Sequence, residues 1–286
     1  MAETRYDIAG QAPIPGTREA DLVGCIMHDF AELQTWRNTT ATQWEEVAGL
    51  IAPNYCNTFM YGNYNWPGQK KTDRQIDCTG MMALSRFAAI CDSLITPRNM
   101  IWHQLEADNE YVMKDRASKL WFHNTTMAMF KARYAPIANF ASQNAQVFNH
   151  LGAFGTGPMF VDQACDEGGA LLRAMRYKSI PLGEMYLMEN HQGLVNGCIR
   201  WFRLTARQCK TKWPDKALPP TLQSAYDAGS QTLFNFLHHI VPNKERDAKR
   251  IDAKGMKFAS TYICIEGNKR NAGGRLSHLP DLGGPL

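Results

Sequence analysis

The spacing of apolar residues divides the chain into a helical first half and a second half rich in strands. In the first half, apolar residues recur every three or four positions, which is the period of an α-helix. The segments with this spacing are 17–36, 42–53, 77–97, 109–134 and 137–152. Proline ends the second and third of them, at Pro53 and Pro97, because it cannot continue a helix.

Two of these expected helices carry a well-defined apolar stripe that should face a core. In the third, the stripe consists of Leu84, Phe87, Ala88, Cys91, Leu94 and Ile95. In the fourth, it consists of Met113, Ala117, Leu120, Trp121, Met127 and Phe130. Four tryptophans fall at positions where the pattern already requires an apolar residue, which predicts core packing for Trp44, Trp102, Trp121 and Trp201.

After Gly157 the pattern changes to that of short strands bounded by Gly, Pro, Asn or Asp. Strands are expected at 159–162, 170–177, 184–189, 194–202, 234–241 and 257–266, and helices at 205–212 and 222–228. The segment 190–193 predicts a hairpin turn. Consecutive short strands with tight turns favour one antiparallel sheet. We therefore predict an α+β fold in which N-terminal amphipathic helices pack with an antiparallel sheet.

Composition defines the ends of the expected domain. Residues 1–16 contain Pro and Gly without an apolar pattern, which is typical of a flexible arm. Residues 267–286 are rich in Gly and Pro and predict an irregular tail. Since no linker separates the helical half from the stranded half, residues 17–266 are expected to form one α+β domain.

Overall composition is that of a globular protein. Of 286 residues, 44% are hydrophobic and 20% are charged, which excludes a chain that is disordered throughout. The net charge is only +4, and basic residues alternate with acidic ones, even in the dense run at 244–250. A dedicated reader of duplex DNA usually carries a denser basic face. We interpret the run as a solvated surface.

The cysteines and the N-terminus indicate a reducing compartment. Eight cysteines are present without a C-x-x-C pair, and the N-terminus lacks the apolar segment of an export signal. We expect free thiols that pack as small apolar groups, at Cys78, Cys91 and Cys198 among others. No apolar stretch is long enough to span a membrane.

No motif assigns catalytic, cofactor-binding or metal-binding residues. The glycine-rich segment 152–157 lacks the Lys-Ser or Lys-Thr of a phosphate-binding loop, and we interpret it as a tight helix-to-strand turn. Cys25 and His28 have the spacing of two metal ligands but no second pair nearby. His238 and His239 should point to opposite faces of a strand. Glu184 and Arg200 are expected to form an ion pair between neighbouring strands.

Several short blocks follow one another in a fixed order through most of the chain. They are WEEVAGLIAP at 44–53, DCTGMMAL at 77–84, LITP at 94–97 followed by Trp102, LGAFGTG at 151–157, IPLGEMY at 180–186, RWFRLTARQ at 200–208 and HIVP at 239–242. In order and spacing these blocks resemble the head-to-tail connecting (portal) proteins of short-tailed bacteriophages, roughly from residue 30 to residue 265.

The resemblance implies a virion structural protein without enzymatic activity or cofactors. Proteins of this kind form ring homo-oligomers, commonly of twelve subunits, at one vertex of the capsid. It implies contacts with the capsid, the packaging ATPase (terminase), tail proteins and, non-specifically, double-stranded DNA, and no contact with membranes. The expected location is the virion, and the host cytoplasm during assembly.

The resemblance also implies which part of a portal is present. The matched region corresponds to the peripheral wing, whereas the stem, clip and crown lie mainly beyond it. We therefore expect a portal protein that is truncated at its C-terminus or encoded in two pieces. Two alternatives stay open: a soluble enzyme with a site assembled from residues distant in sequence, and a nucleic-acid-binding module whose DNA affinity falls steeply with added salt.

Overall fold

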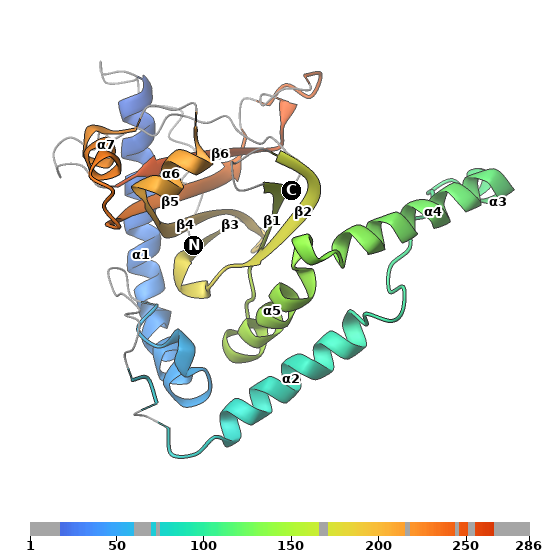
Figure 1. Cartoon of the computed structure of the whole chain (residues 1–286), viewed down its shortest axis with the longest axis horizontal. Helices are drawn as coiled ribbons and strands as arrows, with labels where there is room; N and C mark the ends of the chain where they lie inside the picture. The colour runs from blue at the N-terminus through green and yellow to red at the C-terminus, as the bar shows by residue number, and fades with distance from the viewer. Residues whose placement is uncertain are drawn as a thin grey trace. The chain divides into compact units, whose positions relative to one another are not determined.

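The computed structural model describes residues 18–59, 70–72, 75–165, 171–214, 218–243, 246–250 and 255–265. These residues form two compact units (Figure 1). The first, the sheet unit, combines the described residues up to Thr40 with those from Glu184 onwards. The second, the helical unit, spans Ala41–Gly183. The predicted arm 1–16 and tail 267–286 lie outside the described residues, and the boundaries of the domain stay predictions.

The first helix, α1 (Arg18–Ile51), is continuous, so the prediction of two helices separated near residue 40 was wrong. The polar residues between them include neither glycine nor proline. The hydroxyls of Thr39 and Thr40 donate to the backbone oxygens of Trp36 and Arg37, at 2.7 and 3.0 Å. Such bonds satisfy the hydroxyls within the helix, and the helix therefore continues to the residues before Pro53.

The sheet unit is built on four antiparallel strands whose spatial order follows the sequence. The turn at 190–193 is confirmed, because Asn190 and Leu194 are joined by a backbone hydrogen bond of 2.9 Å. The elements are β3 (Met185–Glu189), β4 (Val195–Thr205), α6 (Ala206–Lys212), α7 (Pro220–Asp227), β5 (Leu233–Pro242) and β6 (Phe258–Cys264).

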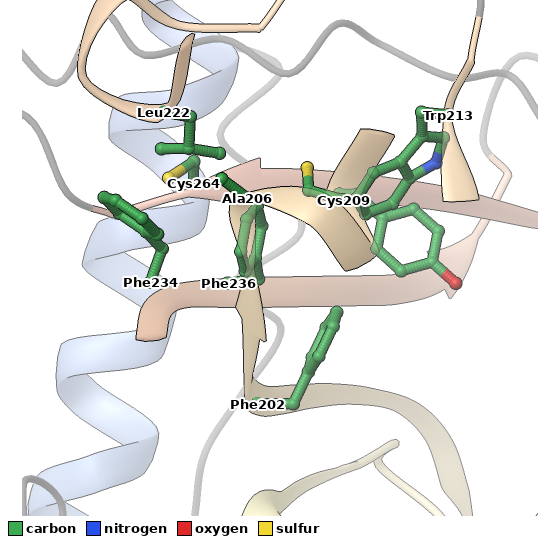
Figure 2. Close-up of a cluster of buried hydrophobic side chains, with 9 residues drawn as sticks. Phe202, Ala206, Cys209, Trp213, Leu222, Phe234, Phe236 and Cys264 are labelled. Atoms are coloured by element: carbon green, nitrogen blue, oxygen red, sulfur yellow. The ribbon is translucent and has the colours of Figure 1, made fainter. Parts of the chain in front are cut away.

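Both faces of this sheet are buried, and side chains alternate between the two faces along each strand. Leu237 belongs to the core on one face and its neighbour Phe236 to the core on the other. The first core includes α1 and consists of Val23, Ile26, Phe30, Tyr186, Met188, Ile199, Trp201, Leu237 and Ile263. The second includes α6 and α7 and consists of Phe202, Ala206, Cys209, Trp213, Leu222, Phe234, Phe236, Tyr262 and Cys264 (Figure 2).

The helical unit holds the second sheet of the described chain. Two strands, β1 (Met159–Cys165) and β2 (Leu171–Ser179), pair with each other and not with β3 or β4. The prediction of one antiparallel sheet was therefore wrong, although the α+β class with antiparallel pairing is confirmed. The segment between β2 and β3 contains a proline and a 3-10 turn, Leu182–Glu184, which interrupts the strand pattern.

The helices of this unit are α2 (Thr79–Ile95), α3 (Glu110–Lys114), α4 (Arg116–Arg133) and α5 (Phe140–Phe154). The expected helix 109–134 is divided at Asp115, whose backbone is extended and whose carboxylate accepts from the Ser118 backbone nitrogen at 2.9 Å. This N-cap begins a new helix, which explains the division. Helix α2 packs against α5, and α5 packs on β2.

Candidate assembly surface

Side chains of a type that could bind a metal ion make contacts within the fold. Across the ranges that the structure describes, no set of three or more His, Cys, Asp or Glu side chains could hold a metal ion. Cys25 is exposed on α1, and His28 lies 3.6 Å from the carboxylate of Glu32. His28 is therefore engaged in a surface contact within its own helix.

Three buried histidines are held neutral by their surroundings. His238 contacts Ser260 Oγ at 2.7 Å and stacks on Tyr262, and burial, with the nearby Lys212 as a smaller contribution, lowers its pKa to about 3. Burial lowers the pKa of His239 to about 4, and that of His150, which lies 3.4 Å from Ser179 Oγ, to about 4. Sequence reasoning overlooked His150, because its place on the buried side of α5 shows no motif.

The eight cysteines are free thiols, but their environments differ. Cys56, Cys209 and Cys264 are buried, and burial raises the pKa of Cys209 to about 12. Cys78, which was expected to pack as an apolar group, is exposed at the N-cap of α2. The buried thiols of Cys56, Cys209 and Cys264 are unreactive and act in packing.

The glycine-rich block is a turn, as predicted. Gly155 ends α5 with a left-handed backbone, at φ +76°, which glycine adopts without strain. A Cβ atom added at Gly157 would lie 2.5 Å from the backbone oxygen of Val147. The block therefore brings β1 close against α5.

The LITP block and Trp102 meet through one hydrogen-bond network. Tyr134 receives a hydrogen bond from Trp102 Nε1 at 3.1 Å and donates to the Thr96 backbone oxygen at 3.1 Å. Asn144 donates to Thr96 Oγ1 at 2.8 Å and to Asp92 Oδ1 at 3.3 Å. The network fixes the exit of α2 to α4 and α5, which gives these motif residues a structural role.

The blocks at 180–186 and 200–208 also act in packing. Arg200 donates from Nε and Nη2 to Glu184 Oε2, at 2.9 and 2.8 Å, which confirms the predicted ion pair. At the junction of β4 and α6, Thr205 and Gln208 each bond the other's backbone nitrogen. This reciprocal cap begins α6 at the residue after the strand.

Several residues that were expected inside the core are exposed. On α2 these are Phe87, Leu94 and Ile95, and on α4 they are Leu120 and Trp121. The exposed fraction reaches 76% at Leu94 and 60% at Trp121, whereas Trp44 and Trp102 are half-buried and Trp201 is buried. The period of each helix was right, but only part of each apolar stripe has a neighbour within the described chain.

Further apolar side chains on α2 and α3 are exposed to solvent. Ile90 on α2 is 56% exposed, and Tyr111 and Val112 on α3 are 80% and 39% exposed. Exposed apolar residues that gather on neighbouring turns mark surfaces for protein contact. None of the described helices is apolar over a stretch long enough to cross a bilayer.

The chain is similar in sequence to proteins of two bacteriophages. The chain is 25% identical over 244 residues to the probable portal protein of Bordetella phage BPP-1, a match that covers 83% of this chain and 41% of that protein. It is also 25% identical over 239 residues to the portal protein of Salmonella phage epsilon15, with the same coverage of 83% and 41%. The chain thus spans about two fifths of the length of these curated relatives.

The family comparison covers more of the chain. The sequence model described as bacteriophage head to tail connecting protein matches residues 24–280. This range contains every motif block from 44 to 242 and both structural units from the first turns of α1 onwards. A role in connecting head to tail is a structural one, in keeping with side chains that serve packing. The chain belongs to the family of bacteriophage head-to-tail connecting proteins.

Proposed function

We propose that this chain acts as a portal subunit that assembles with copies of itself into a ring at one vertex of a phage capsid. The observation that carries this proposal is the family match over residues 24–280. Both relatives described above are named as portal proteins, one of them as a probable one. By its resemblance to short-tailed phage portals the ring would contain twelve subunits.

The described region would supply the wing of the ring. This wing would span residues 17–266, and within each described unit the motif blocks hold helices and strands in place. The capping box that begins α6 and the Arg200–Glu184 pair stabilise this framework. In this role the chain works by shape and assembly, without a catalytic step.

The partners follow from the position of such a ring. The ring would contact the capsid around it, the packaging ATPase during genome entry, and tail proteins afterwards. The protein would be present in the host cytoplasm during assembly and in the finished virion. Double-stranded DNA would pass through the ring and be contacted without regard to sequence. A mild net charge of +4 suits such weak contact, because tight phosphate binding would hold the DNA in place.

Size measurement of the full chain tests the proposal directly. Light scattering coupled to size-exclusion chromatography should show oligomers whose mass is a multiple of 32.3 kDa. Negative-stain electron microscopy should show rings or arcs of subunits in the largest fraction. A protein that stays monomeric at about 10 mg/ml, well above the micromolar range of weak association, would overturn the proposal.

A second measurement separates this function from the two alternatives. A portal should bind random-sequence duplex DNA weakly and without preference between sequences. Strong binding to one sequence would favour a nucleic-acid-binding module instead. Turnover of a small molecule, lost on replacement of a buried residue such as His150, would favour an enzyme.

A further inference from the structure

Helix α2 lacks the polar face that a surface helix normally has. Among its 17 residues only Arg86 and Asp92 are charged. The Asp92 side chain is 18% exposed and is engaged by Arg98, Thr96 and Asn144. Arg86 is therefore the one charged side chain that α2 presents to solvent. A helix that is apolar nearly all round is typical of a buried position.

The apolar residues of α2 form two adjoining stripes. Leu84, Ala88 and Cys91 lie on the side that packs against α5, where Gly152 allows a close approach: a Cβ added there would lie 2.9 Å from the Leu84 side chain. Ile90 and Leu94 lie on the exposed side, with Phe87 between the two stripes. We call Phe87, Ile90 and Leu94 the α2 face.

A second apolar surface lies on a projecting part of the same unit. Figure 1 shows α4 leading away from α5, with α3 at its far end. The hydrogen bonds that tie α4 to the preceding segment involve Thr126, Arg133 and Tyr134, at or beyond the middle of the helix. We call residues 106–125 the arm; this segment is distinct from the flexible arm predicted at residues 1–16.

The arm exposes apolar and acidic side chains together. Tyr111, Val112, Leu120 and Trp121 are exposed on it. Glu106, Asp108 and Glu110 are exposed directly before Tyr111 and Val112, whereas the basic residues Lys114, Arg116 and Lys119 lie between Val112 and Leu120. The α2 face carries the opposite charge, from Arg86. The acidic start of the arm, at Glu106, Asp108 and Glu110, is therefore complementary in charge to Arg86, and both surfaces are apolar.

We propose that the arm of one copy of this chain packs on the α2 face of a neighbouring copy. The inference rests on the proposed function, because it names the contact through which the ring would form. Two different surfaces of one chain make a head-to-tail contact, which leaves each copy able to bind one neighbour on each side. Repetition of that contact produces a closed ring or an open chain, whereas contact between two α2 faces would stop at a dimer.

Two single substitutions disable the two surfaces separately. Ile90→Asp places a charge in the α2 face and leaves the arm intact, and Trp121→Asp does the reverse. Each variant alone should associate at least about 30-fold more weakly than wild type, as expected for the loss of a central apolar anchor. Ser85→Asp, on the other side of α2, and Lys119→Asp, on the other side of α4, serve as controls and should assemble like wild type.

A mixture of the two variants distinguishes the possible contacts. The intact arm of Ile90→Asp can bind the intact α2 face of Trp121→Asp, and the resulting pair cannot extend. Mass photometry of the mixture should therefore show a 1:1 heterodimer, while each variant alone stays monomeric. Circular dichroism checks that both variants retain the wild-type fold, which is expected because both positions are exposed.

Each other outcome overturns the inference in a recognisable way. If Trp121→Asp alone still dimerises, α2 faces pair with each other. If Ile90→Asp alone still dimerises, arms pair with each other. If both assemble into wild-type oligomers, the ring contact lies elsewhere and the proposed function still stands. If wild type itself does not associate, the proposed function fails as well.

Discussion

The side-chain amide of Asn144 donates a hydrogen bond of 2.8 Å to the hydroxyl of Thr96, inside the helical unit. Both side chains are buried, and the hydroxyl of Thr96 also contacts Asp92 Oδ1 at 3.2 Å. Thr96 is the last residue before Pro97, where α2 ends. The Asn144 amide on α5 therefore holds the end of α2, and with it the LITP block, together with the Tyr134 hydroxyl, which donates to the Thr96 backbone oxygen.

Replacement of Asn144 by leucine should destabilise the helical unit by about 2–3 kcal/mol, because Thr96 and Asp92 lose a buried donor. Urea unfolding followed by circular dichroism measures the change. Gln146→Leu is the matched control, since Gln146 is exposed on the same helix, and it should change stability by less than about 0.5 kcal/mol. Equal effects of the two changes would show that the hydrogen bond to Thr96 contributes little.

The sequence predicted which segments are helices and strands, because the period of apolar residues is a local property. The hairpin turn at 190–193 and the Glu184–Arg200 pair were also predictable, since both depend on neighbours across one turn. The continuity of α1 was not predicted, because polar residues near Arg37 suggested a break. Arg37 is in fact buried: it donates to the Met185 backbone oxygen at 2.9 Å and lies over the Tyr186 ring.

The exposed surfaces could not be predicted for a different reason. An apolar stripe shows that a helix face avoids water, but it does not show what covers that face. The pattern predicted that Leu84 and Leu94 on α2 would both face a core, whereas α5 covers Leu84 and leaves Leu94 exposed. The division of strands between two sheets likewise depends on contacts between distant segments, which no local pattern contains.

Gly183 lies where no side chain can fit. A Cβ atom at this position would lie 2.3 Å from the backbone oxygen of Thr58, which cannot move as a side chain does. Gly183→Ala should therefore destabilise the protein by more than about 2 kcal/mol. Gly24→Ala, at an exposed position in the second turn of α1 with no atom within 4 Å of the added Cβ, should instead stabilise it by about 1 kcal/mol. Thermal unfolding of the two variants should shift in opposite directions, and a shift of both in one direction would contradict this account.

The Arg200–Glu184 pair should contribute measurably, because the Arg200 side chain is only 15% exposed and its guanidinium also lies 4.9 Å from the centre of the Phe202 ring. Glu184→Gln leaves this cation without its carboxylate partner and should cost about 1–3 kcal/mol. Glu189→Gln is the same substitution at the exposed end of β3 and should cost less than about 0.5 kcal/mol. Urea unfolding compares them, and a loss at Glu184 that 1 M salt removes would indicate a solvent-exposed pair instead.

The buried histidines should make the protein sensitive to acid. The pKa is about 4 for His150 and His239 and about 3 for His238 in the folded protein, and about 6.5 for each in the unfolded chain. Between these values the unfolded chain binds more protons, so stability falls as the pH is lowered from about 6.5 to about 4. Urea unfolding at a series of pH values measures the slope. His239→Gln, whose side chain takes up no proton, should make the slope shallower, whereas His123→Gln at an exposed position should leave it unchanged. Identical slopes for both variants would show that other groups, such as carboxylates, cause the sensitivity.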